Sequence, residues 1–332
     1  MIQRLPTSVL VTGASGFLGD HVCRTLLAEG VAVRALIRRP EAPVPEGVMV
    51  QVARGLDDLE ALRCALACVE GVIHLAARVH QPRSAGDEDS FRAVNVEETR
   101  ALLEGSIRAG VRVFLFFSTV KVMGETTDAP WTEATVPAPA GPYGATKLEA
   151  ERLVRELASQ HGLHAPILRL PVTYGPGMRA NALELFRAVD RGLPLPLGGI
   201  HNRRSLLYVG NLMAAVRATL TSDGGNDTFF VSDAHDLSTS DLVTAVARAL
   251  GRPARLITVP VPLLRAMGRV GDVVARVLPF PVTSATVGRL VGSLAVDSSK
   301  LSQRTGFAPP YSVDQGLRDT ANWYRSFSRG GK

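Results

Sequence analysis

Short apolar runs alternate with longer amphipathic stretches along the first half of the chain. The runs have the length of strands, and most of the stretches repeat their apolar positions with helical spacing. The predicted strands are 8–11, 31–37, 48–52, 71–75, 111–117 and 166–170. The first predicted helix follows the first strand and ends at about 29, and the others cover 57–67, 90–109 and 142–160. This order predicts right-handed βαβ units, in which helices cover both faces of a parallel sheet.

The pattern loosens after residue 175. Proline and glycine interrupt residues 175–199, and short helical patterns then alternate with single apolar runs. Residues 256–294 are largely apolar but contain several arginines and an aspartate. They therefore predict a packed helical lobe and no membrane insertion, because a spanning helix needs a longer uncharged run.

Composition excludes several classes of protein. Hydrophobic residues make up 46% of the 332, and 20% are charged, which is typical of a globular protein. The net charge is +6, but the basic residues are scattered and only 5% of the residues are aromatic, so we expect no nucleic-acid partner. Cys23, Cys64 and Cys68 lack metal-ligand spacing, and we expect no metal site. Cys64 and Cys68 lie four apart on a predicted helix, which favours reduced core thiols and a cytoplasmic protein.

A glycine-rich turn joins the first predicted strand to the first predicted helix. Gly13 allows a sharp turn, Gly16 allows the backbone to approach a pyrophosphate, and Gly19 allows close packing of helix on strand. The remaining predicted cofactor contacts in this turn are Ser15, Phe17 and Leu18. We therefore expect an NAD(P)-binding Rossmann domain, doubly wound, over 1–175. Residues 176–332 should form mainly a smaller α/β substrate-binding lobe, with part of the chain returning to the first domain.

The end of the second strand bears on the choice of cofactor. An acidic residue there accepts a hydrogen bond from the ribose of NAD, whereas arginine suits the 2′-phosphate of NADP. The sequence has Arg38 and Arg39 at this point and no acid before Glu41. We therefore expect Arg38 to favour NADP(H) over NAD(H). The alternative is that both arginines are solvated.

A tyrosine and a lysine lie one turn apart at the start of a predicted helix. Tyr143 and Lys147 share a helix face, and a nearby ammonium lowers the pKa of a phenol, as proton transfer at neutral pH requires. The turn after the predicted strand 111–117 carries two hydroxyls, Ser118 and Thr119. Either could hydrogen-bond the oxygen of a reacting substrate, and we favour Thr119 as the catalytic one. The alternative for each hydroxyl is capping of the loop backbone.

Together these segments resemble the extended short-chain dehydrogenase/reductases, a family of sugar-nucleotide epimerases, dehydratases and reductases. The resemblance covers nearly the whole chain and rests on Thr12–Gly19, His74–Ala77, Asn95, the set Thr119, Tyr143 and Lys147, and Tyr174–Pro176. It implies that Leu75, Ala76, Ala77 and Pro171 line the cofactor and that Lys147 also holds the nicotinamide ribose. It further implies a homodimer.

The resemblance also implies a substrate-binding arm in the second half of the chain. Arg204, in the segment 203–211, matches the position that contacts a nucleotide diphosphate, and Asn181 and Pro196 lie in segments like those around the diphosphate and uracil. Arg289 could be a second phosphate ligand, although its spacing departs from the family pattern. Solvation is the alternative for both arginines. Lys121 either touches the substrate or points to solvent.

Among the family's activities, dehydration is disfavoured, because Val120 and Lys121 replace the Asp–Glu pair that follows the catalytic threonine in the 4,6-dehydratases. Arg38 favours a reductase that transfers hydride to the C4 keto group of a UDP-4-keto-6-deoxy-N-acetylhexosamine, in surface-polysaccharide synthesis. The alternatives are a UDP-glucose or UDP-N-acetylglucosamine 4-epimerase and a small-ketone reductase of the dihydroflavonol-reductase type. A non-catalytic NADP-sensing protein would be expected to lose the Thr–Tyr–Lys set.

Overall fold

The computed structural model describes residues 4–56, 58–79, 87–222, 225–275 and 283–330. Seven parallel strands form the main sheet in the order β3-β2-β1-β4-β5-β6-β9. Their bounds are β1 Ser8–Thr12, β2 Ala32–Ile37, β3 Met49–Val52, β4 Gly71–His74, β5 Val113–Thr119, β6 Ile167–Leu170 and β9 Thr228–Phe230. The predicted Rossmann-type parallel sheet is confirmed.

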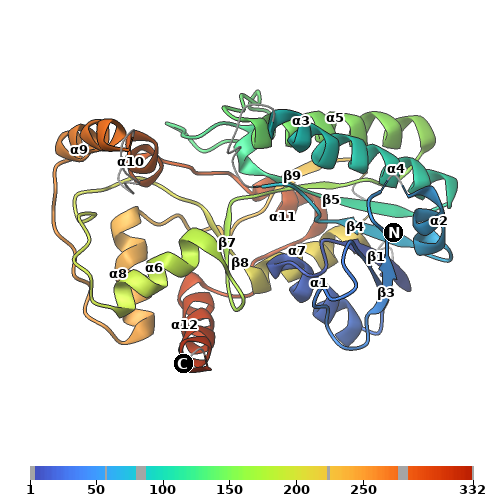
Figure 1. Ribbon diagram of the computed structural model, residues 1–332, viewed down its shortest axis with the longest axis horizontal. Helices are drawn as coiled ribbons and strands as arrows, with labels where there is room; N and C mark the ends of the chain where they lie inside the picture. Colours follow the sequence, from blue (N-terminus) through green and yellow to red (C-terminus); the bar gives the residue numbers. More distant parts are fainter. Residues whose placement is uncertain (1–3, 57, 80–86, 223–224, 276–282, 331–332) are drawn as a thin grey trace.

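Helices cover both faces of this sheet (Figure 1). One face carries α1 Phe17–Ala28 and α7 Val209–Thr221, and the other carries α2 Leu59–Leu66, α4 Glu98–Arg108 and α5 Pro142–His161. Strand β5 is buried along its whole length, and its residues alternate between the two cores, with Leu115 in one and Phe114 and Phe116 in the other. This alternation explains the nearly continuous apolar run that predicted the strand.

The second half of the chain contributes to both parts of the molecule. Strands β7 Val172–Tyr174 and β8 Leu206–Tyr208 form a small parallel sheet, and β9 returns to pair with β6. The lobe at the far end contains α6 Ala180–Asp190, α8 Thr239–Leu250, α9 Val261–Val274 and α10 Ser284–Val291 (Figure 1). The chain ends with α11 Ser299–Thr305, beside β9, and α12 Val313–Gly330, which packs on α8.

Two predicted helices differ from those observed. The predicted helix 90–109 consists of α3 Asp87–Arg92, a π-helical turn at Ala93–Glu97, and α4. The predicted helix 57–67 begins at Leu59 and ends at Leu66, and residue 57 lies outside the described residues. Cys68 therefore follows the helix, with φ +59°.

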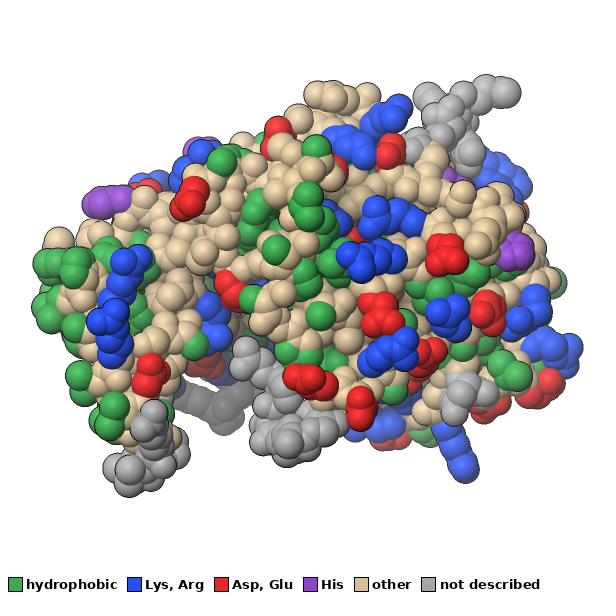
Figure 2. Space-filling model, turned by 90° about the horizontal axis from the view of Figure 1, so that it is seen from above, with side chains coloured by type: hydrophobic (Ala, Val, Ile, Leu, Met, Phe, Trp, Pro, Cys, Tyr) green, Lys and Arg blue, Asp and Glu red, His purple; other side chains and the backbone are tan. Residues whose placement is uncertain are grey.

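Both thiols, at Cys64 and Cys68, are free, as expected, but the expectation that they lie in the core is wrong, because both side chains are exposed. Cys23, on α1, is buried in the core. Figure 2 shows Lys and Arg side chains interspersed with Asp and Glu on the face it presents. Among the described residues, no helix is both long and apolar enough to cross a membrane.

Candidate active site

The glycine turn after β1 lies against the end of β4. Gly13 has φ +73°, and a Cβ on it would lie 2.8 Å from the amide nitrogen of Ala76. A Cβ on Gly19 would lie 2.2 Å from the carbonyl oxygen of Gly13, so α1 could not approach the turn with a larger residue there. The structure thus brings Leu75 and Ala76 to the turn, as the sequence predicts, while Ser15, Phe17 and Leu18 lie in the turn and at the start of α1.

A buried histidine fixes the end of β4. The amide of Ala76 donates to Thr12 Oγ1 at 3.3 Å, and this hydroxyl lies 2.6 Å from His74 Nδ1. His74 Nε2 lies 2.9 Å from Thr99 Oγ1, whose proton goes to the carbonyl oxygen of Asn95. Nε2 therefore donates, and in the neutral ring Nδ1 accepts from the Thr12 hydroxyl. Burial, with a smaller contribution from Lys147, lowers the pKa of His74 to about 3.

The π-helical turn carries Asn95, which joins the loop after β4 to the start of α5. Its Oδ1 accepts from the amide of Arg78 at 2.8 Å, and its Nδ2 donates to the carbonyl oxygen of Arg78 at 3.1 Å and to Thr146 Oγ1 at 3.0 Å. The wider turn of a π-helix is often found at functional sites. Here Asn95 connects the segment bearing Ala76 to the helix bearing Tyr143.

Thr119 and Tyr143 meet at the carboxyl end of β5. Thr119 Oγ1 accepts from the amide of Lys121 at 3.2 Å, so the hydroxyl caps the short turn Val120–Val122. Burial raises the pKa of Tyr143 to about 12, and a hydrogen bond with Thr119 partly opposes the increase. Both roles considered for the Thr119 hydroxyl, backbone capping and contact with the reacting group, are therefore compatible.

Gly144 explains why the phenol can reach Thr119. A Cβ on Gly144 would lie 2.4 Å from the carbonyl oxygen of Lys121, closer than any side chain can approach backbone. The first turn of α5 therefore rests directly on the turn that follows β5. Glycine at this position brings Tyr143 and Thr119 together.

Lys147 lies one turn after Tyr143 on α5 and is buried. Its Nζ lies 3.8 Å from the centroid of the Phe116 ring. Burial lowers the pKa of Lys147 to about 7, and the Glu151 carboxylate acts in the opposite direction. A lysine with this pKa exchanges its proton near neutral pH, which suits a group that tunes a neighbouring phenol.

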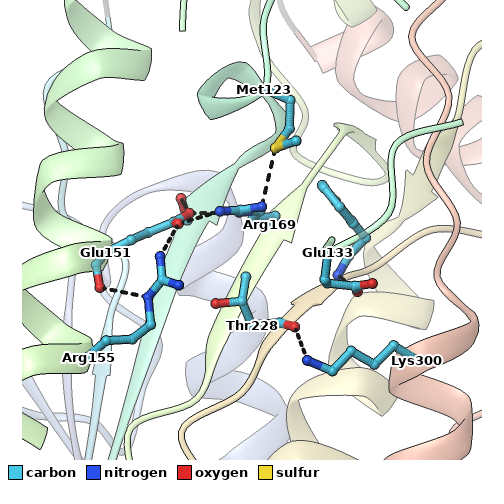
Figure 3. Close-up of polar contacts among 9 residues, drawn as sticks. Met123, Glu133, Glu151, Arg155, Arg169, Thr228 and Lys300 are labelled. Atoms are coloured by element: carbon cyan, nitrogen blue, oxygen red, sulfur yellow. Dashed lines mark hydrogen bonds and ion pairs between the residues drawn. The ribbon is translucent and has the colours of Figure 1, made fainter. Parts of the chain in front are cut away.

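A buried ion pair links Glu151, one turn after Lys147 on α5, to Arg169 on β6 (Figure 3). Glu151, a further turn along α5, accepts hydrogen bonds from Arg169 Nε at 3.0 Å and Arg169 Nη2 at 2.7 Å. Arg169, on β6, also lies near Met123 Sδ, at 3.2 Å, and over the ring of Phe230. Arg155 reaches the same carboxylate from the surface at 3.4 Å. The pair therefore connects α5, β6 and the turn after β5.

Ser118 is hydrogen-bonded to this buried pair. Its Oγ donates to Glu151 Oε1 at 2.5 Å, and its side chain is buried. Successive strand residues point to opposite faces, so Ser118 cannot face the same way as Thr119. The structure therefore gives the Ser118 hydroxyl a protein partner, and its contact with a substrate stays a prediction. Its hydroxyl instead anchors the strand end that carries Thr119.

Arg38 lies at the end of β2, as expected, but it has an acidic partner from elsewhere in the chain. Arg38 Nη2 donates to both carboxylate oxygens of Glu98, at 2.6 and 2.9 Å. Glu98 begins α4 and is 60 residues away in sequence, so strand-end reasoning could not identify it.

Pro171 is buried between β6 and β7. It directly follows Leu170, the residue that pairs with Thr119 in the sheet.

The predicted substrate residues lie in different parts of the second half of the chain. Arg204 Nη1 donates to the carbonyl oxygens of Arg289 at 2.7 Å and Gly292 at 3.1 Å, so the structure brings Arg204 to the end of α10 that carries Arg289. Burial lowers the pKa of Arg204, and Glu125 acts against this. Arg289 is exposed; Asn181 is exposed at the second position of α6, and Pro196 is partly buried beside the Leu195–Leu256 bridge.

Lys121 has an ion-pair partner four residues later. Its Nζ donates to Glu125 Oε2 at 2.5 Å, and about a third of the Lys121 side chain is exposed. The same Glu125 influences Arg204, so the turn after β5 and the predicted diphosphate arm are electrostatically connected. Val120 is buried. Neither position supplies a carboxylate to the site.

Comparison with known proteins identifies the family. The sequence of residues 9–231 matches the NAD dependent epimerase/dehydratase family. The chain belongs to this family. A UDP-glucose 4-epimerase of Vibrio cholerae is 32% identical over 329 residues, which cover 96% of each chain. An N-acetyl-α-D-glucosaminyl-diphospho-ditrans,octacis-undecaprenol 4-epimerase of Escherichia coli O157:H7 is 28% identical over 321 residues, which cover 95% of each.

Solved structures in the epimerase/dehydratase family share the fold. The structure of MoeE5 in complex with UDP-glucuronic acid and NAD superimposes with a TM-score of 0.76 at 28% identity, and the match covers 96% of this chain and 99% of MoeE5. These findings confirm the resemblance to the extended short-chain dehydrogenase/reductases. The chain is therefore of the type that acts on nucleotide sugars.

Three charged residues of the candidate site were not identified from the sequence. Glu98, Glu151 and Arg169 each act through contacts with residues distant in sequence. Glu151 carried one usable signal, because it lies four residues after Lys147 and therefore on the same helix face. Arg169 lies in a strand that is otherwise apolar and buried, and such an arginine requires a buried partner.

Proposed function

We propose that the chain is a UDP-sugar 4-epimerase acting on a UDP-hexose or UDP-N-acetylhexosamine. The observation that carries the proposal is the hydrogen-bonded pair Thr119 and Tyr143, with Lys147 one turn away, at the strand end beside the glycine turn. The activities named for the Vibrio and E. coli relatives support 4-epimerisation, and the ligands of MoeE5 support a UDP-sugar with NAD.

The glycine turn fits a dinucleotide. Side chains at Gly13 or Gly19 would collide with backbone, so the turn keeps a bare concave backbone at the start of α1, which suits a pyrophosphate. The segment 13–19 would hold the phosphates, and Lys147 would hold the nicotinamide ribose. NAD, when bound, supplies a reversible hydride acceptor at its nicotinamide ring.

The side chains of the chain then move one proton. Tyr143 takes the proton of the sugar 4-hydroxyl as C4 is oxidised and returns it when C4 is reduced on the other face. Thr119 Oγ1 orients the same oxygen. Lys147 as an ammonium stabilises the phenolate, which is needed because burial alone raises the pKa of Tyr143 to about 12.

The remainder of the site favours retention of the sugar's hydroxyl groups. A 4,6-dehydratase needs a carboxylic acid and a carboxylate beside C5 and C6, whereas Val120 is buried and Lys121 is a cation paired with Glu125. Arg204 would bind the diphosphate, because its Nη1 is fixed by two carbonyl oxygens and the planar guanidinium is thereby oriented.

A second candidate is a UDP-sugar 4-ketoreductase using NADPH. The observation in its favour is Arg38, which is half-exposed at the end of β2, a strand without an acidic residue. Against it, Glu98 neutralises this guanidinium in a two-oxygen contact, which weakens attraction for a 2′-phosphate and favours NAD. A small-ketone reductase is favoured less, since it has no use for Arg204 as a diphosphate ligand.

Incubation with UDP-glucose and with UDP-N-acetylglucosamine, without added cofactor, tests the proposal. We expect formation of the C4 epimer with no net change in the cofactor, and loss of at least about a thousandfold in rate for Tyr143→Phe. Stoichiometric oxidation of added NADPH by a UDP-4-keto sugar, with no epimer formed from either UDP-sugar, would replace the epimerase with the reductase.

The assembly and location belong to the same proposal. We propose a cytoplasmic homodimer, on the family resemblance and the free cysteines Cys23, Cys64 and Cys68. Light scattering of the purified chain measures the assembly directly. A mass of one chain at micromolar concentration would contradict the dimer.

A further inference from the structure

Helix α9 is the least buried long helix of the far lobe. Only Leu264, Gly268 and Gly271 of its fourteen residues are buried. Gly268 packs so closely on α10 that a Cβ would lie 3.0 Å from Ser284 Cα. One narrow stripe thus attaches α9 to α10, and the rest of its surface faces outward at the end of the molecule (Figure 1).

The outward surface of α9 is apolar. Its exposed large hydrophobic side chains recur at helical spacing: Leu263 (53% exposed), Met267 (44%), Val270 (65%) and Val273 (61%). At about 100° per residue, they fall within one arc of about 120°, which adjoins the buried stripe on the side of Met267 and extends away from it. Single exposed apolar residues need no explanation, but a row of four along one helix indicates an interaction surface.

Two arginines border this apolar face. Arg265 and Arg269 lie one turn apart, both exposed, and neither forms a hydrogen bond or ion pair with the described residues. The only acid of α9 and α10 is Asp272, which accepts from the amide of Ser284 at 2.9 Å. Figure 2, which views the molecule from above, shows hydrophobic side chains next to Lys or Arg side chains at its left end, where α9 and α10 lie.

From this combination we infer that α9 docks the protein on an anionic lipid surface. A helix that combines an apolar face with flanking arginines lies in the plane of the interface, with its apolar side chains among the acyl chains and its cations at the headgroups. A second copy of the chain fits less well. Two α9 helices packed together would bring four arginines near one another, with Asp272, which already accepts from Ser284, as the one carboxylate on each helix.

The docking helix is connected to the predicted substrate arm. Asn202 and Arg204 both donate to carbonyl oxygens at the end of α10, on which α9 rests. Attachment of α9 to a lipid surface would therefore hold the arm next to that surface. The inference does not depend on the proposed reaction, because vesicle binding needs neither substrate nor cofactor.

Flotation of the full chain with vesicles tests the inference. The probes are phosphatidylcholine vesicles with and without phosphatidylglycerol at about a third of the lipid. We expect binding to the anionic vesicles, weakened when salt is raised from about 0.1 M to about 1 M, since the Debye length falls from about 10 Å to about 3 Å. The variant Arg265→Gln/Arg269→Gln should bind about thirtyfold less, at about 1 kcal/mol per cation.

A matched pair of triple variants separates α9 from general surface hydrophobicity. Leu263→Ser/Met267→Ser/Val270→Ser should reduce vesicle binding by at least about a hundredfold. The control Leu59→Ser/Met49→Ser/Val50→Ser changes the same residue types at similar exposure on α2 and β3 and should bind as wild type does.

Three outcomes would overturn the inference. One is wild-type flotation with anionic vesicles no greater than with neutral ones, and another is equal loss in both triple variants. The third is that the wild type does not bind vesicles and that an α9 variant dissociates a dimer, measured by light scattering. A second copy of the chain, and not a lipid surface, would then cover α9. All the changed residues are exposed, and circular dichroism together with the urea unfolding midpoint checks that the variants fold.

Discussion

The buried pair of Glu151 and Arg169 allows a controlled test of how the site is supported. The Arg169 side chain is 3% exposed and that of Glu151 is fully buried, whereas Arg155, which contacts the same carboxylate, is 43% exposed. Arg169→Met removes two hydrogen bonds, at 2.7 and 3.0 Å, and leaves a buried carboxylate without its main cation. Arg155→Met removes two peripheral contacts with Glu151, one to its carboxylate at 3.4 Å and one to its backbone carbonyl oxygen at 3.3 Å.

These differences set the expected magnitudes. Breaking a buried pair by removal of one partner costs about 3–5 kcal/mol, and an exposed contact contributes about 0–1 kcal/mol. We therefore expect Arg169→Met to lower the free energy of unfolding by several kcal/mol more than Arg155→Met, measured by urea denaturation followed through tryptophan fluorescence. The double variant Glu151→Leu/Arg169→Met should regain most of this loss, since neither charge is left unpaired.

The double variant also separates stability from catalysis. Glu151→Leu removes the acceptor of the Ser118 hydroxyl, and Ser118 precedes Thr119 at the strand end. We expect kcat to fall by up to about a hundredfold in the stable double variant, because displacement of a reacting group by about 1 Å has that effect. Equal destabilisation by Arg169→Met and Arg155→Met, or a double variant with wild-type kcat, would refute the reasoning.

Three further predictions concern single residues. Burial lowers the pKa of His74 from 6.5 to about 3, so as the pH falls below 6.5 the unfolded chain is protonated before the folded one. The wild type should therefore lose about 2 kcal/mol of stability between pH 7 and pH 5. Urea denaturation at the two pH values should show this loss for the wild type and not for His74→Gln. Gly144→Ala should lower kcat at least about tenfold, because the added Cβ would collide with the Lys121 carbonyl oxygen and move Tyr143. The control Ala145→Gly, on the exposed side of the same turn, should affect only stability. Similar kcat values for both variants would contradict the role of Gly144. Glu98→Gln should strengthen NADPH binding relative to NADH in fluorescence titrations, because Arg38 loses its negative partner, and an unchanged ratio would mean that Arg38 lies away from the 2′ position.

The sheet could be predicted from the sequence because its signals are local. Strand β5 is a run of apolar residues with turn signals on both sides, and the glycine turn fixes where α1 begins. The π-helical turn at 93–97 could not be predicted, since its apolar spacing is close to that of an α-helix. The exposure of Cys64 also escaped prediction, because its position on a helix does not say which side of the helix is covered.

The candidate site divides in the same way. Thr119, Tyr143 and Lys147 have a recognisable order and spacing, and the structure brings Thr119 and Tyr143 into contact. The contact of Ser118 with Glu151 was missed because the direction of a side chain at a strand end depends on register with β6 and α5. The partner of Arg38 was missed because a helix that begins 60 residues later supplies it. Contacts between segments distant in sequence leave no periodic signal.

The return of β9 to the sheet has a consequence for any attempt to divide the protein. Strand β6 is hydrogen-bonded to β5 on one side and to β9, from residues 228–230, on the other. A fragment ending near residue 175 would expose the backbone of β6 along an apolar edge and would tend to aggregate through it. The seven-stranded sheet is therefore completed only after much of the second half of the chain has been synthesised, and the two halves cannot be exchanged between relatives as independent modules.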